Sequence, residues 1–322
     1  MSFISSPTIS QTEIALRLKD EENVIKTGIQ FVDDATGGIH RNELLLLGGP
    51  SGVGKTETCC NIAWENILSG KVVHYIALEA EQYEIERRIK YKIFFQLYIK
   101  ESRQSSWLLN YKNWRLGRFA IEHADLEAEC ASIFENQAKG LFTYYKQSKF
   151  DVAEFIKIVL YCANETDLII VDHVHYFDFD DQNENRAIKE IAKTARELSI
   201  HQGKPIILVS HIRKSDRFSK SKCPGLEDFH GSSDLFKIAT KAITFAPGTH
   251  YSNNGKSETY MRIVKDRFDG SLQNHMACLV FNSMEGRYEK RYKIGPSSQN
   301  RDEEFHAYPS NSIPAWAKHV RQ

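Results

Sequence analysis

The stretch Leu44–Glu57, LLLLGGPSGVGKTE, constrains the fold more than any other part of the chain. Four consecutive leucines predict a strand buried on both faces, because a strand with one exposed face would alternate apolar and polar residues. A glycine-rich turn then leads into a predicted helix over residues 56–68. A buried strand, a tight turn and a helix in this order indicate an α/β domain with a mostly parallel central sheet.

The turn between this strand and helix fits G-x-x-x-x-G-K-[ST], the pattern of a phosphate-binding P-loop. Glycines allow successive backbone N–H groups to surround a phosphate, and the positive end of the helix adds to the attraction. Lys55 would contact the β and γ phosphates of ATP, and the Thr56 hydroxyl would be a ligand of Mg²⁺. The alternative is a chance match in a glycine-rich turn, which the flanking strand and helix disfavour. The predicted nucleotide-binding residues are Gly49, Pro50, Ser51, Gly52, Val53, Gly54, Lys55, Thr56 and Glu57.

A second motif lies at residues 166–172, TDLIIVD, where an apolar strand ends in a carboxylate. Strands ending in Asp are common, so the pattern is informative only because it follows a P-loop. There it is typical of a Walker B strand, whose carboxylate helps to hold magnesium. Thr56 and Asp172 are therefore the predicted Mg²⁺ residues.

Composition limits the class of protein. At 322 residues and 41% hydrophobic content, the chain can bury one large core or two smaller ones, and the spacing of the motifs favours one α/β domain. No apolar run approaches the ~18 residues of a membrane span, and MSFISSPTISQTE is unlike a signal peptide, so we expect a cytoplasmic protein. Six cysteines without a C-x-x-C pair predict reduced, mostly buried thiols. With 42 basic and 42 acidic residues, the chain as a whole shows no charge signature of nucleic-acid binding.

The pattern along the chain predicts three parts. Residues 1–25 read as an arm or linker helix, residues 26–294 as the ATPase domain, and residues 295–322 as a poorly ordered tail. Residues 100–139 read as mostly helical and polar, and we assign no role to the aromatics at 107, 111 and 114. The other predicted strands are residues 71–78, 141–145, 205–210, 241–245, 260–265 and 276–281; helices are predicted after Glu79, from Asp151, and between the acidic loop 177–184 and Gly203.

Six segments in order, from TGIQFVDDATGGIHRNELLLLGGPSGVGKT through YIALEAE, LIIVDHVHYF, PIILVSHIRKS and LEDFHGSSDLFKIATKAITF to MRIVKDRFDG, resemble the RecA-like ATPase domain of DnaB-family replicative helicases. The resemblance covers residues 26–290. KaiC and RadA-type proteins share the first three elements. The resemblance to the DnaB family implies a RecA-like core of mostly parallel strands flanked by helices, with a few antiparallel strands at the carboxy-terminal end.

Within this resemblance, Glu79 corresponds to the carboxylate that activates the attacking water. The end of the strand beside the P-loop strand is within reach of the γ phosphate, so the chemistry agrees. The alternative is a carboxylate that only stabilises a helix N-terminus. His211 stands where the family usually has a Gln that senses the γ phosphate, and histidine would bring a charge that varies near neutral pH. A plain polar residue at a strand end is the alternative for His211.

Lys265 and Arg267, in a K-x-R sequence after a strand, correspond to the pair that the family inserts into the neighbouring subunit's nucleotide site. The resemblance thus implies a homo-oligomer, a ring such as a hexamer or a filament, because an arginine finger in trans needs a neighbour. The alternative is a solvated pair of basic residues at a strand end.

Two features depart from the family pattern. The arm before Thr27 is too short to hold the primase-contacting domain of replicative helicases, so that domain is expected to be missing. The loop after Asp172 is acidic, with Asp178, Asp180, Asp181 and Glu184, and would repel a phosphate backbone. The loop after His211 is basic, and single-stranded DNA would bind there through Arg213, Lys214, Arg217, Lys220 and Lys222.

Two functions remain open from the sequence. The first is a magnesium-dependent, DnaB-like ATPase motor that acts on DNA as a helicase or translocase. The second is a KaiC-like, ATP-switched assembly factor that binds a partner protein and has little or no helicase activity. Neutral charge and the acidic loop favour the second, whereas the K-x-R pair and residues 183–198 favour the first.

Overall fold

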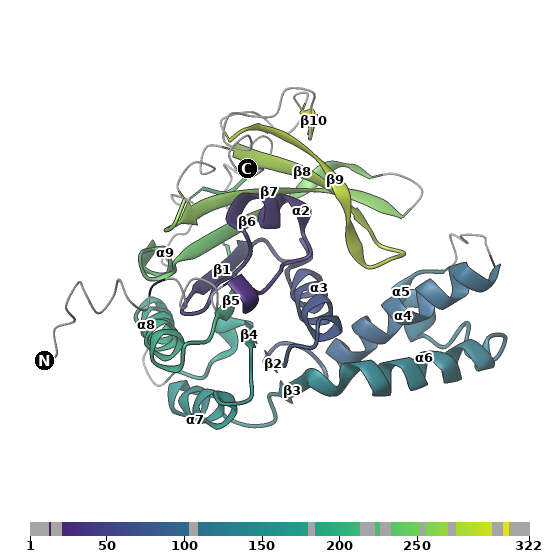
Figure 1. Cartoon of the computed structure of the whole chain (residues 1–322), viewed down its shortest axis with the longest axis horizontal. Coiled ribbons are helices and arrows are strands. Elements are labelled where there is room, and N and C mark those ends of the chain that lie inside the picture. Colours follow the sequence, from purple (N-terminus) through teal and green to yellow (C-terminus); the bar gives the residue numbers. More distant parts are fainter. Residues whose placement is uncertain are drawn as a thin grey trace, which may run out of the picture.

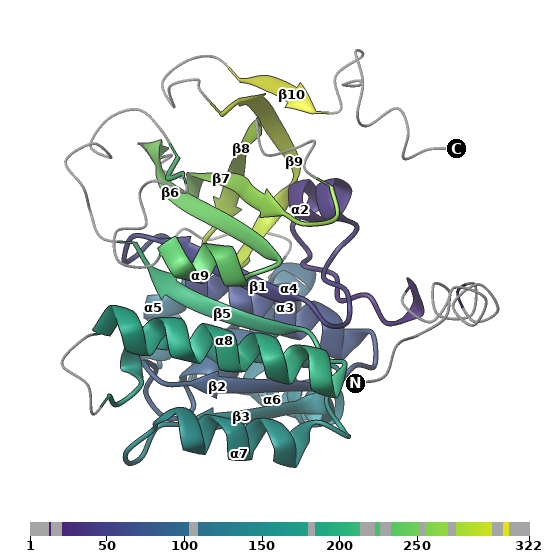
Figure 2. The same ribbon diagram turned by 90° about the vertical axis from the view of Figure 1, so that its left-hand side faces the viewer.

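The computed structural model describes residues 13, 21–102, 109–179, 184–212, 223–225, 233–251, 255–269, 275–297 and 305–308. Within them, ten strands form one sheet in the order β10-β9-β8-β7-β6-β1-β5-β4-β2-β3, with helices on both faces (Figures 1 and 2). The strands are β1 (Leu44–Gly49), β2 (Val73–Ala77), β3 (Leu141–Tyr145), β4 (Leu168–Asp172), β5 (Ile206–His211), β6 (Lys241–Tyr251), β7 (Lys256–Asp266), β8 (His275–Asn282), β9 (Arg287–Pro296) and β10 (His306–Tyr308).

The predicted P-loop strand β1 lies in the parallel part of the sheet. It pairs in parallel with β5 on one side and with β6 on the other. Strands β4, β2 and β3 extend the parallel part beyond β5. Since the carboxyl ends of parallel strands share one edge of a sheet, the residues that follow β1, β2, β4 and β5 are brought together there.

The four leucines of β1 show why this strand is apolar throughout. Leu44–Leu47 are each only 1% exposed. Leu45 and Leu47 belong to one core, under α2 (Gln30–Thr36), α3 (Lys55–Leu68) and α4 (Glu84–Ser102). Leu44 and Leu46 belong to a second core on the other face, under α7 (Val152–Cys162), α8 (Glu184–Gln202) and α9 (Ser233–Ile238). The prediction of a strand buried on both faces is confirmed.

The end of α4, α5 (Tyr111–Arg115) and α6 (Ala124–Gln137) form a helical projection beside the sheet (Figure 1). Its aromatic residues pack on one another. The rings of Tyr111 and Trp114 lie 5.6 and 5.7 Å from that of Tyr91, which is buried on α4. Trp107 is outside the described residues. Packing within the projection therefore accounts for the two described aromatics.

The strands from β6 to β10 pair antiparallel with one another, as predicted for the carboxy-terminal end, and they form a larger part of the sheet than predicted. β6, β7 and β8 confirm three expected strands and extend them, whereas β9 and β10 were missed. The tail was expected to be poorly ordered, but β9 runs to Pro296, and His306–Tyr308 pair with β9. At these residues the prediction was wrong, because strand pairing at the sheet edge supplies hydrogen bonds that composition does not reveal.

Helix predictions agree with the structure in their positions. The side chain of Asp151 accepts a hydrogen bond from the Glu154 N–H at 3.0 Å, so Asp151 caps α7 as expected. The short helix α2 was missed, since its sequence QFVDDAT has too few residues for a helical pattern. All six cysteines are free and buried. None of the helices in the described part of the chain is long and apolar enough to cross a bilayer.

Candidate nucleotide site

The P-loop turns sharply between β1 and α3. A Cβ on Gly49 would lie 3.0 Å from the Phe245 side chain and 3.0 Å from that of Val53, so a larger residue would not fit without movement. Gly52 and Gly54 have φ of 79° and 92°, values that favour glycine. α3 begins immediately afterwards at Lys55. The loop thus presents backbone N–H groups at a helix N-terminus, which suits a phosphate.

The Lys55 ammonium group lies inside this loop. Its Nζ donates to the Gly49 carbonyl at 2.8 Å and to the Pro50 carbonyl at 2.7 Å, and it lies 3.2 Å from His211 Nδ1. The residue is only 6% exposed, and burial lowers the pKa of its ammonium to about 8. The charges of Asp172 and Glu79 oppose this fall. Because neither carboxylate forms an ion pair with Lys55 among the described residues, an anionic phosphate would supply a direct counter-charge.

Asp172 ends β4 beside the P-loop. Its Oδ2 accepts a hydrogen bond from the Tyr75 hydroxyl at 2.7 Å, and Thr56 lines the same cavity. Burial raises the pKa of Asp172, and the hydrogen bond from Tyr75 opposes that rise. The buried Oδ1 has no hydrogen-bond partner among the described residues. An unpaired carboxylate oxygen next to a threonine hydroxyl fits Mg²⁺, which prefers oxygen ligands.

Glu79 and Glu81 follow β2 and line a cavity of about 480 Å³ with Lys55, Thr56 and Asp172. The Oε2 atom of Glu79 lies 4.0 Å from His211 Nε2, across the cavity. Glu81 instead forms an ion pair with Arg115 of α5, at 2.7 Å. Of these two glutamates, Glu79 thus has its carboxylate turned towards His211, the last residue of β5.

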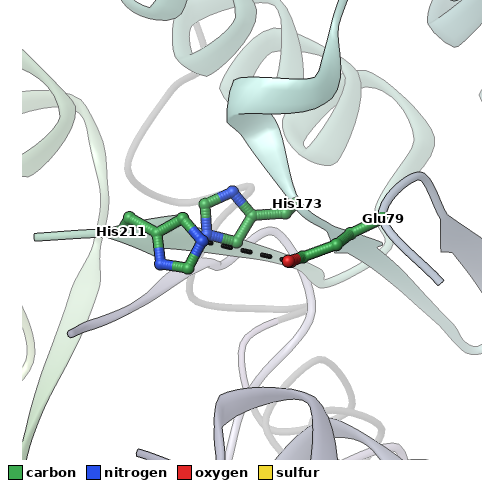
Figure 3. A group of neighbouring side chains, drawn as sticks. All are labelled: Glu79, His173 and His211. Carbon is green, nitrogen blue, oxygen red and sulfur yellow. Dashed lines mark ion pairs between the residues drawn. The ribbon is translucent and has the colours of Figure 1, made fainter. Parts of the chain in front are cut away.

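Three histidines lie close together at the ends of β4 and β5: His173, His175 and His211. The rings of His173 and His211 are 3.8 Å apart between centroids and lie beside each other opposite Glu79 (Figure 3). Burial, and then the positive charge of Lys55, lower the pKa of His211 to about 4. The expectation that its charge varies near neutral pH was therefore wrong, because the ring stays neutral there. A neutral ring can still donate a hydrogen bond to a phosphate oxygen.

Three predicted nucleotide-binding residues have other roles in the loop. The carboxylate of Glu57 forms an ion pair with Arg88 at 3.0 Å and another with Lys92. Val53 is 9% exposed and packs against Gly49, and Pro50 offers its carbonyl to Lys55. The ion pairs of Glu57 thus link the start of α3 to α4, whereas Val53 and Pro50 make contacts within the loop.

Lys265 and Arg267 lie far from this cavity. Because β7 runs antiparallel to β6, its end at Asp266 pairs with Lys241 at the start of β6. The pair is therefore at the edge where β1 begins, roughly 16 Å from the P-loop at ~3.3 Å per strand residue. The structure does not bring these two residues together with Lys55 and Glu79 in one subunit.

Sequence reasoning missed several residues of the site. Tyr75 on β2 donates a hydrogen bond to Asp172, burial and then the Glu79 carboxylate raise the pKa of Tyr176, and the tilted ring of His173 lies 3.8 Å from that of His211. A signal for His173 and Tyr176 was present in the sequence DHVHY after β4, since residues at that position follow a strand that ends at the site. Tyr75 left no signal, because aromatic residues are common in buried strands.

A P-loop at the end of β1, an aspartate at the end of β4 and a glutamate just after β2, the strand that pairs with β4, define a RecA-like P-loop ATPase domain. The expectation that Glu79 ends the strand beside the P-loop strand was wrong, because β5 and β4 lie between β1 and β2. Residues 24–290 match the family "DnaB-like helicase C terminal domain", and the chain belongs to that family. It is therefore an ATP-hydrolysing enzyme of the P-loop class.

Individual proteins agree with this family. A "Probable replicative DNA helicase" of Trieres chinensis is 21% identical over 271 residues, which are 82% of this chain and 56% of that protein. The chain thus spans about half the length of this curated relative. Two solved structures share the fold. One, described as an "ATPase Domain", has a TM-score of 0.69 at 15% identity, over 89% of this chain and 99% of that chain. The other, "The Structure Of A DnaB-Like Replicative Helicase And Its Interactions With Primase", has a TM-score of 0.68 at 16% identity, over 89% of this chain and 67% of that chain.

Proposed function

We propose that the chain is the ATPase unit of an oligomeric, magnesium-dependent motor that acts on DNA, with Arg267 completing the site of a neighbouring subunit. The observation that carries the proposal is the position of the K-x-R pair at the sheet edge opposite the subunit's own P-loop. A neighbour stacked in a ring or filament would bring one edge of the sheet against the other.

Each residue of the site has a separate task in hydrolysis. The P-loop N–H groups and Lys55 would hold the phosphates, and Lys55 would exchange its carbonyl partners for phosphate oxygens. Mg²⁺, bound by Asp172 and Thr56, would neutralise charge that develops on the phosphates. Glu79 would accept a proton from the attacking water. His211, kept neutral by burial, would donate a hydrogen bond to the γ phosphate.

Charge at the far edge supports a role for Arg267 in trans. Arg267 is exposed and has no carboxylate partner within the described ranges, and it lines a cavity together with Arg196. Burial and then the nearby charge of Arg267 lower the pKa of both Arg196 and Lys265. Cations that repel one another are stabilised by an added anion, and a neighbour's γ phosphate is such an anion.

The acidic loop after β4 should repel DNA less strongly than its sequence suggests. Asp178 accepts a hydrogen bond from the Phe150 N–H at 2.6 Å and forms an ion pair with Lys146 at 2.8 Å. Glu184 contacts His175 at 2.9 Å. Two of its four carboxylates therefore have local partners, while Asp180 and Asp181 lie outside the described residues. This supports the DNA motor over the partner-protein switch.

The basic loop after β5 gives the test of DNA binding, although residues 213–222 lie outside the described part of the chain. Neutralising Arg213, Lys214, Arg217, Lys220 and Lys222 together should weaken single-stranded DNA binding. If all five contact phosphates, the slope of log affinity against log salt should fall by up to about 3.5, at ~0.7 per contact. Fluorescence anisotropy across a salt series measures this slope, and ATPase rates with and without DNA show whether binding is coupled to turnover.

Lys139 and Lys157 provide a control, because both are exposed and lie in the short helix η1 (Ala138–Gly140) and in α7, outside the loop after β5. Neutralising them should leave the salt slope unchanged. If wild type does not bind DNA, or the loop variant binds as well as wild type, the proposal of a DNA motor fails. In that case the KaiC-like, partner-binding function becomes the better account.

Lys55→Ala tests the phosphate contacts directly. A hydrogen bond that involves a charged group contributes about 1.5–3 kcal/mol, so ATP affinity should fall by roughly 10- to 150-fold. Isothermal titration calorimetry with ATP and Mg²⁺ measures the change. Lys55→Arg keeps the charge and serves as the control for burial, and thermal melting checks that both variants fold. Unchanged ATP affinity in a folded Lys55→Ala protein would contradict the P-loop assignment.

A further inference from the structure

We propose that Glu79, His173 and His211 form a binding site for a transition-metal ion of the zinc class, separate from the magnesium site, and that the bound ion blocks ATP hydrolysis. The metal chemistry is that of a divalent ion that prefers imidazole nitrogen, with Zn²⁺ and Co²⁺ as probes. The binding part does not depend on the proposed motor function.

The geometry brings one ligand atom from each residue into a small group. These three atoms all lie within 4.8 Å of one another, and His211 Nε2 is 4.0 Å from Glu79 Oε2. Figure 3 shows the two imidazole rings side by side, facing the carboxylate. Ligands at the ~2.0–2.2 Å usual for zinc would be roughly 3.4 Å apart, so they must approach by about 1 Å. The Glu79 side chain is 42% exposed and can make that movement.

His173 supplies a second, independent observation. It is 1% exposed, and its Nε2 is buried with no hydrogen-bond partner among the described residues. Its other ring nitrogen, Nδ1, has only a long contact of 3.4 Å with the His175 N–H. A buried polar atom without a partner is unfavourable, and a metal ion would supply the missing partner. The ring proton would then lie on Nδ1, so the only hydrogen bond given up is this long one.

Ligand type separates this site from the magnesium site. Two neutral imidazoles and one carboxylate suit Zn²⁺, Co²⁺ or Ni²⁺, whereas Mg²⁺ prefers oxygen ligands such as those of Asp172 and Thr56. Excess Mg²⁺ should therefore compete poorly with zinc. A bound ion would take the lone pairs of Glu79 and His211, so neither side chain could act on water or on the γ phosphate.

The binding test uses the full chain without nucleotide or Mg²⁺. Equilibrium dialysis should show one Zn²⁺ per chain that is lost on substitution of the ligands, and Co²⁺ should give a visible absorption band. Glu79→Gln, His173→Asn and His211→Asn should each weaken binding by at least about tenfold. The matched control is His175→Asn, because the His175 ring is directed at Glu184 and Ser210 instead and should leave binding unchanged.

Glu79→Gln keeps the test decisive even if a buried histidine variant fails to fold, because the Glu79 side chain is partly exposed. Zinc binding that survives all three substitutions, or that His175→Asn weakens equally, would overturn the site. With ATP and excess Mg²⁺, zinc should slow turnover of wild type and His175→Asn, with a smaller fractional loss in His173→Asn. Zinc binding without slower ATP turnover would support the metal site but overturn the proposal that the bound ion blocks ATP hydrolysis.

Discussion

Glu79→Gln is expected to bind ATP with near-normal affinity and to hydrolyse it about 10²–10⁴-fold more slowly. The amide is isosteric with the carboxylate but cannot accept the proton of the attacking water. Because Glu79 is partly exposed and Tyr176 and His211 are its neighbours in the cavity, the substitution should not disturb the core. Single-turnover hydrolysis of saturating ATP measures the chemical step, and calorimetry confirms binding.

Glu81→Gln is the matched control, since Glu81 lines the same cavity two residues further along. Its carboxylate is paired with Arg115 and is 71% exposed, so its loss should change turnover only slightly. The opposite pattern, with Glu81→Gln slow and Glu79→Gln active, would show that Glu81 is the base and that the assignment to Glu79 is wrong. If both variants are slow, the two carboxylates share the task.

The fold could be predicted where an element's own sequence shows a clear apolar pattern. The leucines of β1 and the apolar strand ending at Asp172 are buried on both faces, so their sequences carry a strong signal. β9 reads RYEKRYKIGP, with apolar residues only at alternate positions among charged ones, and a charged outer face hid it. β10 has three residues, which is too short for any periodic signal. It exists because β9 offers an open edge for pairing.

The site was predictable where chemistry demands a motif, and not where it depends on contacts between distant strands. The glycines around Lys55 and the carboxylate at Asp172 follow from phosphate and magnesium chemistry. The Tyr75 hydroxyl reaches Asp172 across 97 residues of sequence, and His173 meets His211 only because β4 and β5 are neighbours. The low pKa of His211 likewise depends on burial and on Lys55, which the sequence alone does not place.

Arg267→Ala is expected to reduce turnover by about 10³–10⁵-fold while ATP binding stays intact. The protomer keeps its own Lys55, Thr56 and Asp172, and the lost charge belongs to the site of a neighbour. Its backbone N–H bonds to the Thr240 carbonyl at 3.0 Å, a contact that alanine preserves, so the edge should stay folded. Steady-state ATPase assays and calorimetry separate the two effects, and light scattering should show wild type with ATP as larger than the 37.0 kDa monomer.

Mixing two inactive variants distinguishes a residue that acts in trans from one that acts within its own subunit. Arg267→Ala subunits have an intact P-loop, and Lys55→Ala subunits have an intact Arg267. Where the two meet in the right order, a complete site forms again, so the mixture should recover part of the activity that neither variant has alone. Because the arginine contributes several orders of magnitude, a minority of such interfaces should be measurable. Mixed assemblies without recovery, or a wild type that hydrolyses ATP as a monomer, would show that Arg267 is an ordinary surface cation.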